Sequence, residues 1–166
     1  GLIAVLAAIG VQIAISRDGP AVLSAVDRIT GGTSGAELKA KIAIGGHPDQ
    51  KILVWGNDAA APENELRRDL RPVLLFVHGG SWNSGDPERY DFVGRAFVEQ
   101  GFVVVLSGYR LGSAGKYPGM IEDTASAFAW TRAEIAQYGG DPQNIIIAGH
   151  SAGAYNMMMV ALESRW

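Results

Sequence analysis

The pentapeptide at residues 149–153 has the residue types of a nucleophile on a sharp turn. It reads Gly-His-Ser-Ala-Gly, with Ser151 at its centre. A serine between a strand and a helix has its hydroxyl pushed out above the sheet, and small flanking residues let the backbone turn tightly. An apolar run starts at Ile145 and helix formers follow Ala152, which is the context such a turn needs. We predict that Ser151 is a nucleophile; the alternative is a chance match in a chain with 22 glycines among 166 residues.

A second glycine cluster, upstream of the first, has the form of an oxyanion-binding loop. Residues 72–77 are typical of a buried strand, which runs directly into His-Gly-Gly-Ser-Trp at positions 78–82. A tetrahedral intermediate needs backbone N–H groups aimed at its oxyanion, and side chains would block their approach. Loops of this form complete the oxyanion hole in esterases. The helix-capping sequence Asp86–Glu88 follows, so this cluster also lies between a strand and a helix.

The elements that must position these loops alternate along the chain. Apolar runs predict buried strands, and helical spacing between them predicts crossover helices. The expected strands are 72–77, 102–106 and the run from 145, and the expected helices span 86–100, 120–138 and the stretch from 152. Residues 38–44 and 51–55 instead predict an antiparallel hairpin at the sheet's edge. We therefore expect an α/β fold with parallel strands covered on both faces.

Together these motifs resemble the α/β-hydrolase fold, and within it the bacterial carboxylesterase and arylformamidase-like branch related to hormone-sensitive lipases. The resemblance covers about residues 38–166. It rests on His78–Trp82, Ser84–Asp86, Tyr109–Leu111, Tyr117–Pro118, Asp123, Trp130, Gly140–Pro142 and Gly149–Ala154.

The resemblance implies that Ser151 attacks an ester to form an acyl-enzyme. It also implies that the backbone N–H groups of Gly80, Ser81 and Ala152 hold the oxyanion. In the family an acid and a histidine follow the serine, so we expect both beyond Trp166 and interpret the chain as an N-terminal fragment of the fold. An arylformamidase or another amide hydrolase is an alternative. So is a non-catalytic, exported or anchored binding protein that has lost the triad.

Trp82 is the candidate for substrate selection. It lies next to the predicted oxyanion position, where a bulky aromatic side chain can form one wall of the acyl pocket. This favours acyl groups of acetyl to butyryl size. The alternative is that Trp82 faces the core and only anchors the loop.

Four other polar residues have simpler explanations than catalysis. His150 neighbours the serine on a tight turn, where adjacent side chains diverge, so we expect a packing residue. We expect His78 to brace its loop, Asp86 to cap a helix, and Asp123 to bond a nearby loop from its own helix.

Composition excludes several functions. The net charge of −3 offers no basic surface for nucleic acid. There is no cysteine, and three scattered histidines form no metal-ligand pattern. The chain has no G-x-G-x-x-G, and its sequence at 110–117 departs from a P-loop. We expect no cofactor and no metal, and a small-molecule ester as the partner.

The N-terminal region predicts export or membrane attachment. Residues 2–15 are apolar apart from Gln12. We interpret residues 1–16 as the tail of a signal peptide or as a membrane anchor, with a buried core helix as the alternative. Residues 17–37 are predicted to be a linker because of the glycine-rich sequence at 31–35, and residues 38–166 to be the hydrolase domain.

Overall fold

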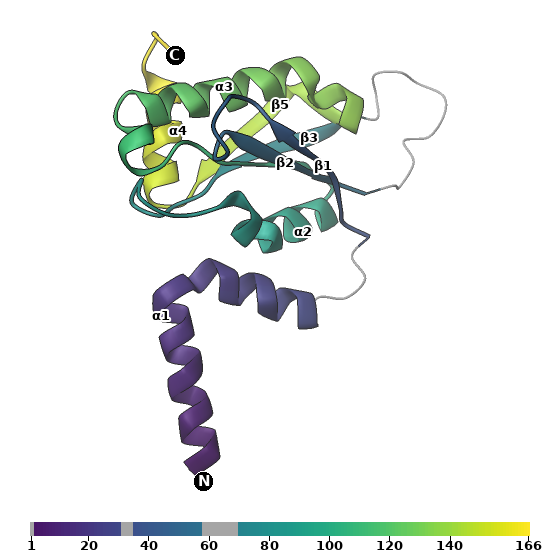
Figure 1. The fold of residues 1–166 in the computed structure, drawn as a ribbon. Coiled ribbons are helices and arrows are strands. Elements are labelled where there is room, and N and C mark those ends of the chain that lie inside the picture. Colours follow the sequence, from purple (N-terminus) through teal and green to yellow (C-terminus); the bar gives the residue numbers. More distant parts are fainter. Residues whose placement is uncertain (1, 31–34, 58–69) are drawn as a thin grey trace.

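A mixed five-stranded sheet forms the centre of the molecule. The computed structural model describes residues 2–30, 35–57 and 70–166. The strands lie in the order β1-β2-β4-β3-β5 (Figure 1). Their bounds are β1 Glu37–Ala43, β2 Lys51–Gly56, β3 Arg71–Val77, β4 Val103–Ser107 and β5 Gly140–Gly149. β3 pairs in parallel with β4 and β5, whereas β2 is antiparallel to β1 and β4. The predicted hairpin at the edge is therefore confirmed.

Helices cover both faces of this sheet. α2 (Asp91–Glu99) lies on one face, and α3 (Gly119–Glu134) and α4 (Ala152–Leu162) lie on the other (Figure 1). Within the described ranges, three short 3₁₀ helices connect the elements: η1 Pro87–Tyr90, η2 Gly112–Gly115 and η3 Ile135–Tyr138. This arrangement is the α/β layering that the sequence predicts.

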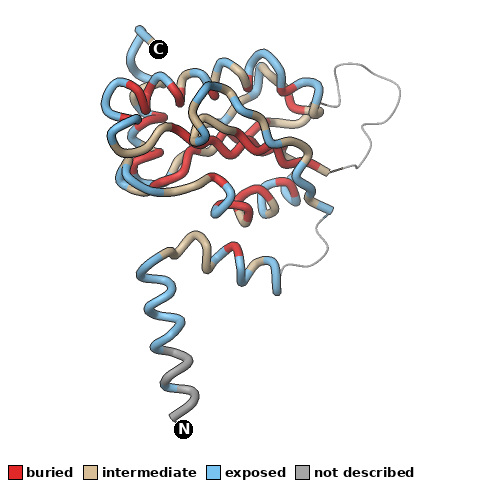
Figure 2. The backbone as a smooth tube through the Cα atoms, viewed as in Figure 1, coloured by how far each residue is buried: buried red, intermediate tan, exposed pale blue. Residues whose placement is uncertain are grey.

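The central strand β4 shows why its sequence is apolar from Val103 to Leu106. All five of its residues are buried (Figure 2). Val103 and Val105 join the core beneath α3 and α4, while Val104 and Leu106 join the core beneath α2. Successive side chains on a strand point to opposite faces, so a strand covered on both sides cannot alternate with polar residues.

Helix signals in the sequence match the boundaries that form. The Asp86 carboxylate accepts a hydrogen bond of 2.9 Å from the N–H of Glu88, with Pro87 as the first residue of η1. This confirms Asp86 as a helix cap. Gly139 adopts φ +79°, a left-handed conformation that costs glycine little, and it ends the predicted crossover helix.

The N-terminal helix α1 (Leu2–Thr30) extends further than predicted. Residues 17–30 were predicted to begin a linker, yet they are helical, and Ser24 is buried against the domain. A break at Asp18 (φ −156°, ψ 72°) divides the helix, and its carboxylate accepts from the N–H of Ala21 at 3.2 Å. Asp18 and Pro20 thus start a second helical segment, as an N-cap and an early proline do. Residues 31–34 lie outside the described residues, and the domain division stays a prediction.

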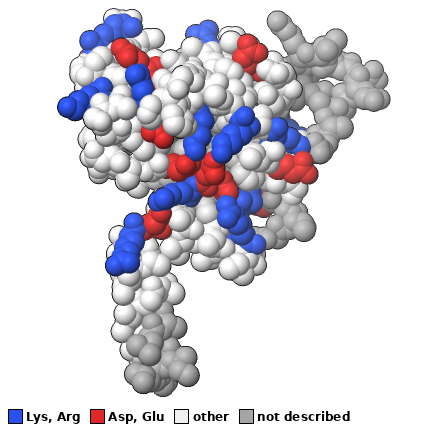
Figure 3. All heavy atoms as spheres, in the orientation of Figure 1, with Lys and Arg blue, Asp and Glu red and all other residues white. Residues whose placement is uncertain are grey.

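Charged pairs hold this second segment to the domain. Arg28 pairs with Asp91, Arg95 with Asp27, and Arg89 with Asp18. Figure 3 shows acidic and basic side chains interleaved at this junction. The described residues of α1 before Arg17 carry no charged side chain and are drawn in white. None of the helices in the described ranges is both long enough and apolar enough to cross a membrane.

Candidate active site

Ser151 occupies a strained turn between β5 and α4. Its backbone adopts φ +50° and ψ −114°, and the residue is exposed. A residue other than glycine in such a conformation costs about 1 to 3 kcal/mol, and it persists only where the surrounding structure enforces it. Strain of this kind gathers at functional sites, so the backbone supports the hypothesis that Ser151 is a nucleophile.

Two glycines allow the turn to be this tight. A Cβ on Gly149 would lie 2.6 Å from the backbone nitrogen of Ala154, inside the first turn of α4. A Cβ on Gly153 would lie 2.2 Å from the carbonyl oxygen of Val77 at the end of β3. Without a side chain at Gly149, the end of β5 can pack closely against the start of α4. Without a side chain at Gly153, α4 can pack closely against the end of β3.

Strand pairing brings the two predicted loops together. β3 and β5 are parallel neighbours, with Val77 opposite Gly149. The N–H of His150 donates to the carbonyl oxygen of Val77 at 3.1 Å. Both loops therefore leave the same edge of the sheet, where ligands bind in open α/β folds.

The loop that follows β3 is held in unusual backbone conformations. Gly80 has φ +132°, and a Cβ there would lie 1.9 Å from the carbonyl oxygen of Ser84. Ser81 and Trp82 follow with φ +52° and +59°. The N–H groups of Asn83 and Ser84 both donate to the carbonyl oxygen of Gly80, at 3.1 and 3.0 Å, which closes the loop into a tight turn.

The three predicted oxyanion donors are unpaired. Over the described ranges, the N–H groups of Gly80, Ser81 and Ala152 donate no hydrogen bond. Ala152 is the first residue of α4, where an N–H has no acceptor within the helix. Unpaired backbone donors beside an exposed serine can stabilise an oxyanion, although their assignment to that role stays a prediction.

Trp82 packs against the helix that follows the serine. Its Nε1–H donates to Oδ1 of Asn156 at 3.0 Å, and its ring meets the ring of Tyr155 edge-on with centroids 5.6 Å apart. Trp82 is half-buried and contacts the core. These contacts support the anchoring role, and the acyl-pocket role stays a prediction. Asn156, fully buried, was missed because a single asparagine in an apolar helix gives no signal in the sequence.

His78 braces its loop from beneath. Its ring is buried, stacks on Tyr109 with centroids 4.6 Å apart, and its Nδ1 lies 2.7 Å from the carbonyl oxygen of Gly79. Burial lowers the pKa of His78, so the neutral ring donates to that carbonyl. The Tyr109 hydroxyl in turn donates to the carbonyl oxygen of His78 at 3.2 Å. These contacts match the bracing role predicted for His78.

Neither predicted non-catalytic carboxylate is available to a triad. Asp86 caps η1 and binds Lys51 at 2.8 Å. Asp123 is buried and accepts from the backbone N–H of Arg110 and from Gln50, at 2.8 and 2.7 Å. The prediction that Asp123 bonds a nearby loop is confirmed. In the described part of the chain, no residue is hydrogen-bonded to the Ser151 hydroxyl, and no three His, Asp or Glu side chains gather as metal ligands.

Comparison with known proteins identifies the family. The BD-FAE family profile matches residues 58–165, which include both glycine loops and the strands and helices around them. The chain belongs to the BD-FAE family. Among curated relatives, it is 40% identical over 99 residues to "Carboxylesterase NlhH" and 41% identical over 121 residues to "Esterase LipQ", both of Mycobacterium tuberculosis. These matches cover 59% and 72% of this chain, and 31% and 27% of the relatives.

Solved structures place this BD-FAE chain in the α/β-hydrolase fold. "Bacterial Heroin Esterase" superposes with a TM-score of 0.68 and 29% identity, over 87% of this chain and 44% of that one. Esterase B from Lactobacillus rhamnosis superposes with a TM-score of 0.72 and 23% identity, over 95% of this chain and 48% of that one, a likeness of fold alone. The chain spans about a third or less of the two curated relatives and about half of these structures.

Proposed function

We propose that the whole protein is a serine hydrolase that cleaves carboxylic esters through an acyl-enzyme on Ser151. The observation that carries this proposal is the turn at Ser151, which is strained to φ +50° and lies beside the N–H of Ala152, a donor with no acceptor among the described residues. The printed names of the curated relatives, a carboxylesterase and an esterase, support an ester as the substrate.

We expect the reaction to proceed in two steps. The Ser151 oxygen bonds to the ester carbonyl carbon and gives its proton to a general base, which passes it to the departing alcohol. The carbonyl oxygen becomes an oxyanion that accepts hydrogen bonds from the N–H groups of Gly80, Ser81 and Ala152. Water then attacks the acyl-enzyme by the same route and releases the acid. The resemblance implies that a histidine and an acid later in the sequence than Ser151 provide the base.

The acyl group is proposed to be small. Trp82 is fixed to Asn156 immediately beside the turn, so its ring cannot swing away without losing that hydrogen bond. A fixed indole next to the oxyanion donors would limit the length of the acyl chain to about butyryl size.

Hydrolysis of two matched substrates by the whole protein tests the proposal. We expect p-nitrophenyl acetate to be cleaved and an N-formyl arylamine to be cleaved far more slowly, with both rates lost in Ser151→Ala. Faster cleavage of the formamide would make the enzyme an amide hydrolase of the same fold. Absence of any reaction and of phosphonate labelling would leave a non-catalytic member of the family.

We also propose that the N-terminal segment exports the protein or attaches it to a membrane. Five of its apolar residues are about half exposed: Val5, Ile9, Val11, Ile13 and Ile15. Apolar side chains around a helix without charges are suited to lipid or to a secretion signal. Membrane fractionation of cells that express wild type and the Ile9→Lys/Ile13→Lys double variant tests this. Equal partitioning of both proteins would contradict it.

A further inference from the structure

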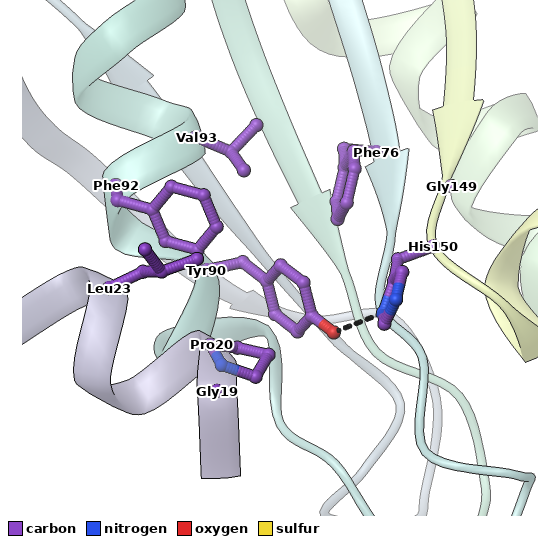
Figure 4. A pocket seen from close by; sticks show the side chains of 9 residues that line it. All are labelled: Gly19, Pro20, Leu23, Phe76, Tyr90, Phe92, Val93, Gly149 and His150. Carbon is purple, nitrogen blue, oxygen red and sulfur yellow. Dashed lines mark hydrogen bonds between the residues drawn. The ribbon is translucent and has the colours of Figure 1, made fainter. Parts of the chain in front are cut away.

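One hydroxyl group connects the oxyanion loop with the nucleophile turn. Tyr90, the last residue of η1, is only 5% exposed. Its oxygen lies 2.9 Å from Nδ1 of His150 (Figure 4). The same oxygen accepts a hydrogen bond of 3.3 Å from the N–H of Gly79. Gly79 directly precedes the predicted oxyanion donor Gly80, and His150 directly precedes the predicted nucleophile Ser151.

The direction of these hydrogen bonds follows from their donors. A backbone N–H can only donate, so the Tyr90 oxygen accepts from Gly79 and its own proton is free to donate to Nδ1 of His150. Burial raises the pKa of Tyr90, so the hydroxyl keeps this proton at neutral pH. His150 can accept this hydrogen bond at Nδ1 when its imidazole is neutral and carries its proton on Nε2.

The two loops also touch directly at this point. A Cβ on Gly79 would lie 2.6 Å from Nδ1 of His150 and 2.9 Å from its carbonyl oxygen. The loops are therefore in contact through Gly79 and His150, and the Tyr90 hydroxyl lies beside this contact.

Apolar packing holds the phenol ring in place. The centroid of the Tyr90 ring lies 5.2 Å from the ring centroid of Phe76 on β3 and 5.9 Å from the ring centroid of Phe92 on α2. The ring and both phenylalanines line an apolar cavity of about 530 Å³, to which Pro20 and Leu23 of α1 also contribute (Figure 4). The hydroxyl points away from these groups towards His150. Because the ring is held from several elements, the hydroxyl can fix two loops that are themselves under backbone strain.

We propose that Tyr90 is a positioning residue that sets the distance between the oxyanion donors and the serine nucleophile. This proposal rests on the proposed function. Catalytic geometry is sensitive at this level, since a misplacement of about 1 Å can cost about 100-fold in rate. Loss of one hydrogen bond that orders the loops should lower kcat by about 10-fold and leave KM nearly unchanged.

Kinetics of variants in the whole protein test this role. We expect Tyr90→Phe to lower kcat for p-nitrophenyl acetate and the rate of phosphonate labelling of Ser151 by a similar factor, about 10-fold, with KM within about twofold. Tyr138→Phe removes a hydroxyl from η3, away from both loops, and should change neither rate. His150→Ala removes the acceptor at an exposed position, so it tests the same bond even if Tyr90→Phe folds poorly.

The double variant distinguishes positioning from general stability. If Tyr90 and His150 act through one bond, Tyr90→Phe/His150→Ala should be no slower than the slower single variant. A Tyr90→Phe enzyme with a lower Tm but an unchanged kcat per labelled site would overturn the positioning role alone. A wild-type protein that neither hydrolyses esters nor labels would refute the proposed function, and the positioning role with it.

Discussion

The indole Nε1–H of Trp82 donates a hydrogen bond to the buried side chain of Asn156, 3.0 Å away on α4. Asn156 is itself fixed, since its Nδ2 donates to Oγ1 of Thr124 at 3.3 Å and to the carbonyl oxygen of Met120 at 3.4 Å. The loop after β3 is thereby tied to the helix that begins after Ser151. The position of the ring relative to the nucleophile is set by α3 and α4 together.

Removing this ring should change the preference for acyl length. In the whole enzyme, Trp82→Ala should raise the ratio of kcat/KM for hexanoyl over acetyl p-nitrophenyl esters by about 10-fold, because each pocket methylene is worth about 1 to 3 kcal/mol. Trp82→Phe keeps a ring but loses the N–H, and should keep most of the wild-type preference. A wild-type optimum already at decanoyl, or one unmoved by Trp82→Ala, would show that Trp82 does not limit the pocket.

Two replacements of Ser151 should separate chemistry from strain. Both Ser151→Ala and Ser151→Gly remove the nucleophile, so labelling by a fluorophosphonate probe should be lost in each. Glycine adopts φ +50° without the strain that alanine keeps, so Ser151→Gly should be about 1 kcal/mol more stable to unfolding than Ser151→Ala. Denaturant titration measures the difference. Labelling that persists in either variant would place the nucleophile elsewhere.

The contact between α4 and β3 should not tolerate a side chain at Gly153. Gly153→Ala places a Cβ 2.2 Å from the carbonyl oxygen of Val77, and backbone must move to relieve it. We expect a loss of at least about 2 kcal/mol in the free energy of unfolding. Gly46→Ala is the matched control, because no atom lies within 4 Å of its Cβ, and it should change stability by less than about 1 kcal/mol. Equal effects of the two substitutions would contradict this account.

The ion pair between the buried Asp123 and the partly exposed Arg110 should be important for stability. Asp123 is 2% exposed and accepts from Nε and Nη2 of Arg110 at 2.8 and 2.7 Å. Asp123→Asn removes the nearer of the two carboxylates that pair with Arg110, and the loss of these charge-assisted hydrogen bonds should cost about 2 kcal/mol. Glu122→Gln alters the exposed carboxylate 3.6 Å from Arg110, and should cost less than about 1 kcal/mol. Unfolding curves of both variants at pH 7 check this contrast.

Asp86 should make stability depend on acid pH. Burial alone would raise the pKa of Asp86, but hydrogen bonds from Lys51 and the N–H of Glu88 outweigh it and hold the pKa below its ordinary value. A carboxylate with a depressed folded-state pKa stabilises above about pH 4, and this contribution is lost as pH falls through that lower pKa. The stability difference between wild type and Asp86→Asn should therefore be present at pH 7 and shrink towards pH 2. A difference that stays constant over this range would rule out the linkage.

The local elements and the two loops could be predicted from the sequence alone. Val103–Ser107 had to form a doubly buried strand because every position in it is apolar or small, and Asp86-Pro87 had to start a helix because cap and proline act on adjacent residues. The glycines at 149 and 153 indicated a tight turn for the same reason. Each signal depends on neighbours in the chain, so it can be interpreted without the fold.

Which of these elements are neighbours depends on the fold as a whole and could not be predicted from local patterns. The placement of β3 between β4 and β5 brings residues 78–82 next to Ser151, although they are far apart in sequence. The pairs Tyr90–His150 and Trp82–Asn156 arise from that placement. The same is true of the ion pairs that attach α1 to the domain, such as Asp27 with Arg95, which involve residues predicted to form a linker. The sequence gives no sign of these contacts because they depend on which buried surfaces pack together, and that packing is a property of the whole sheet and its helices.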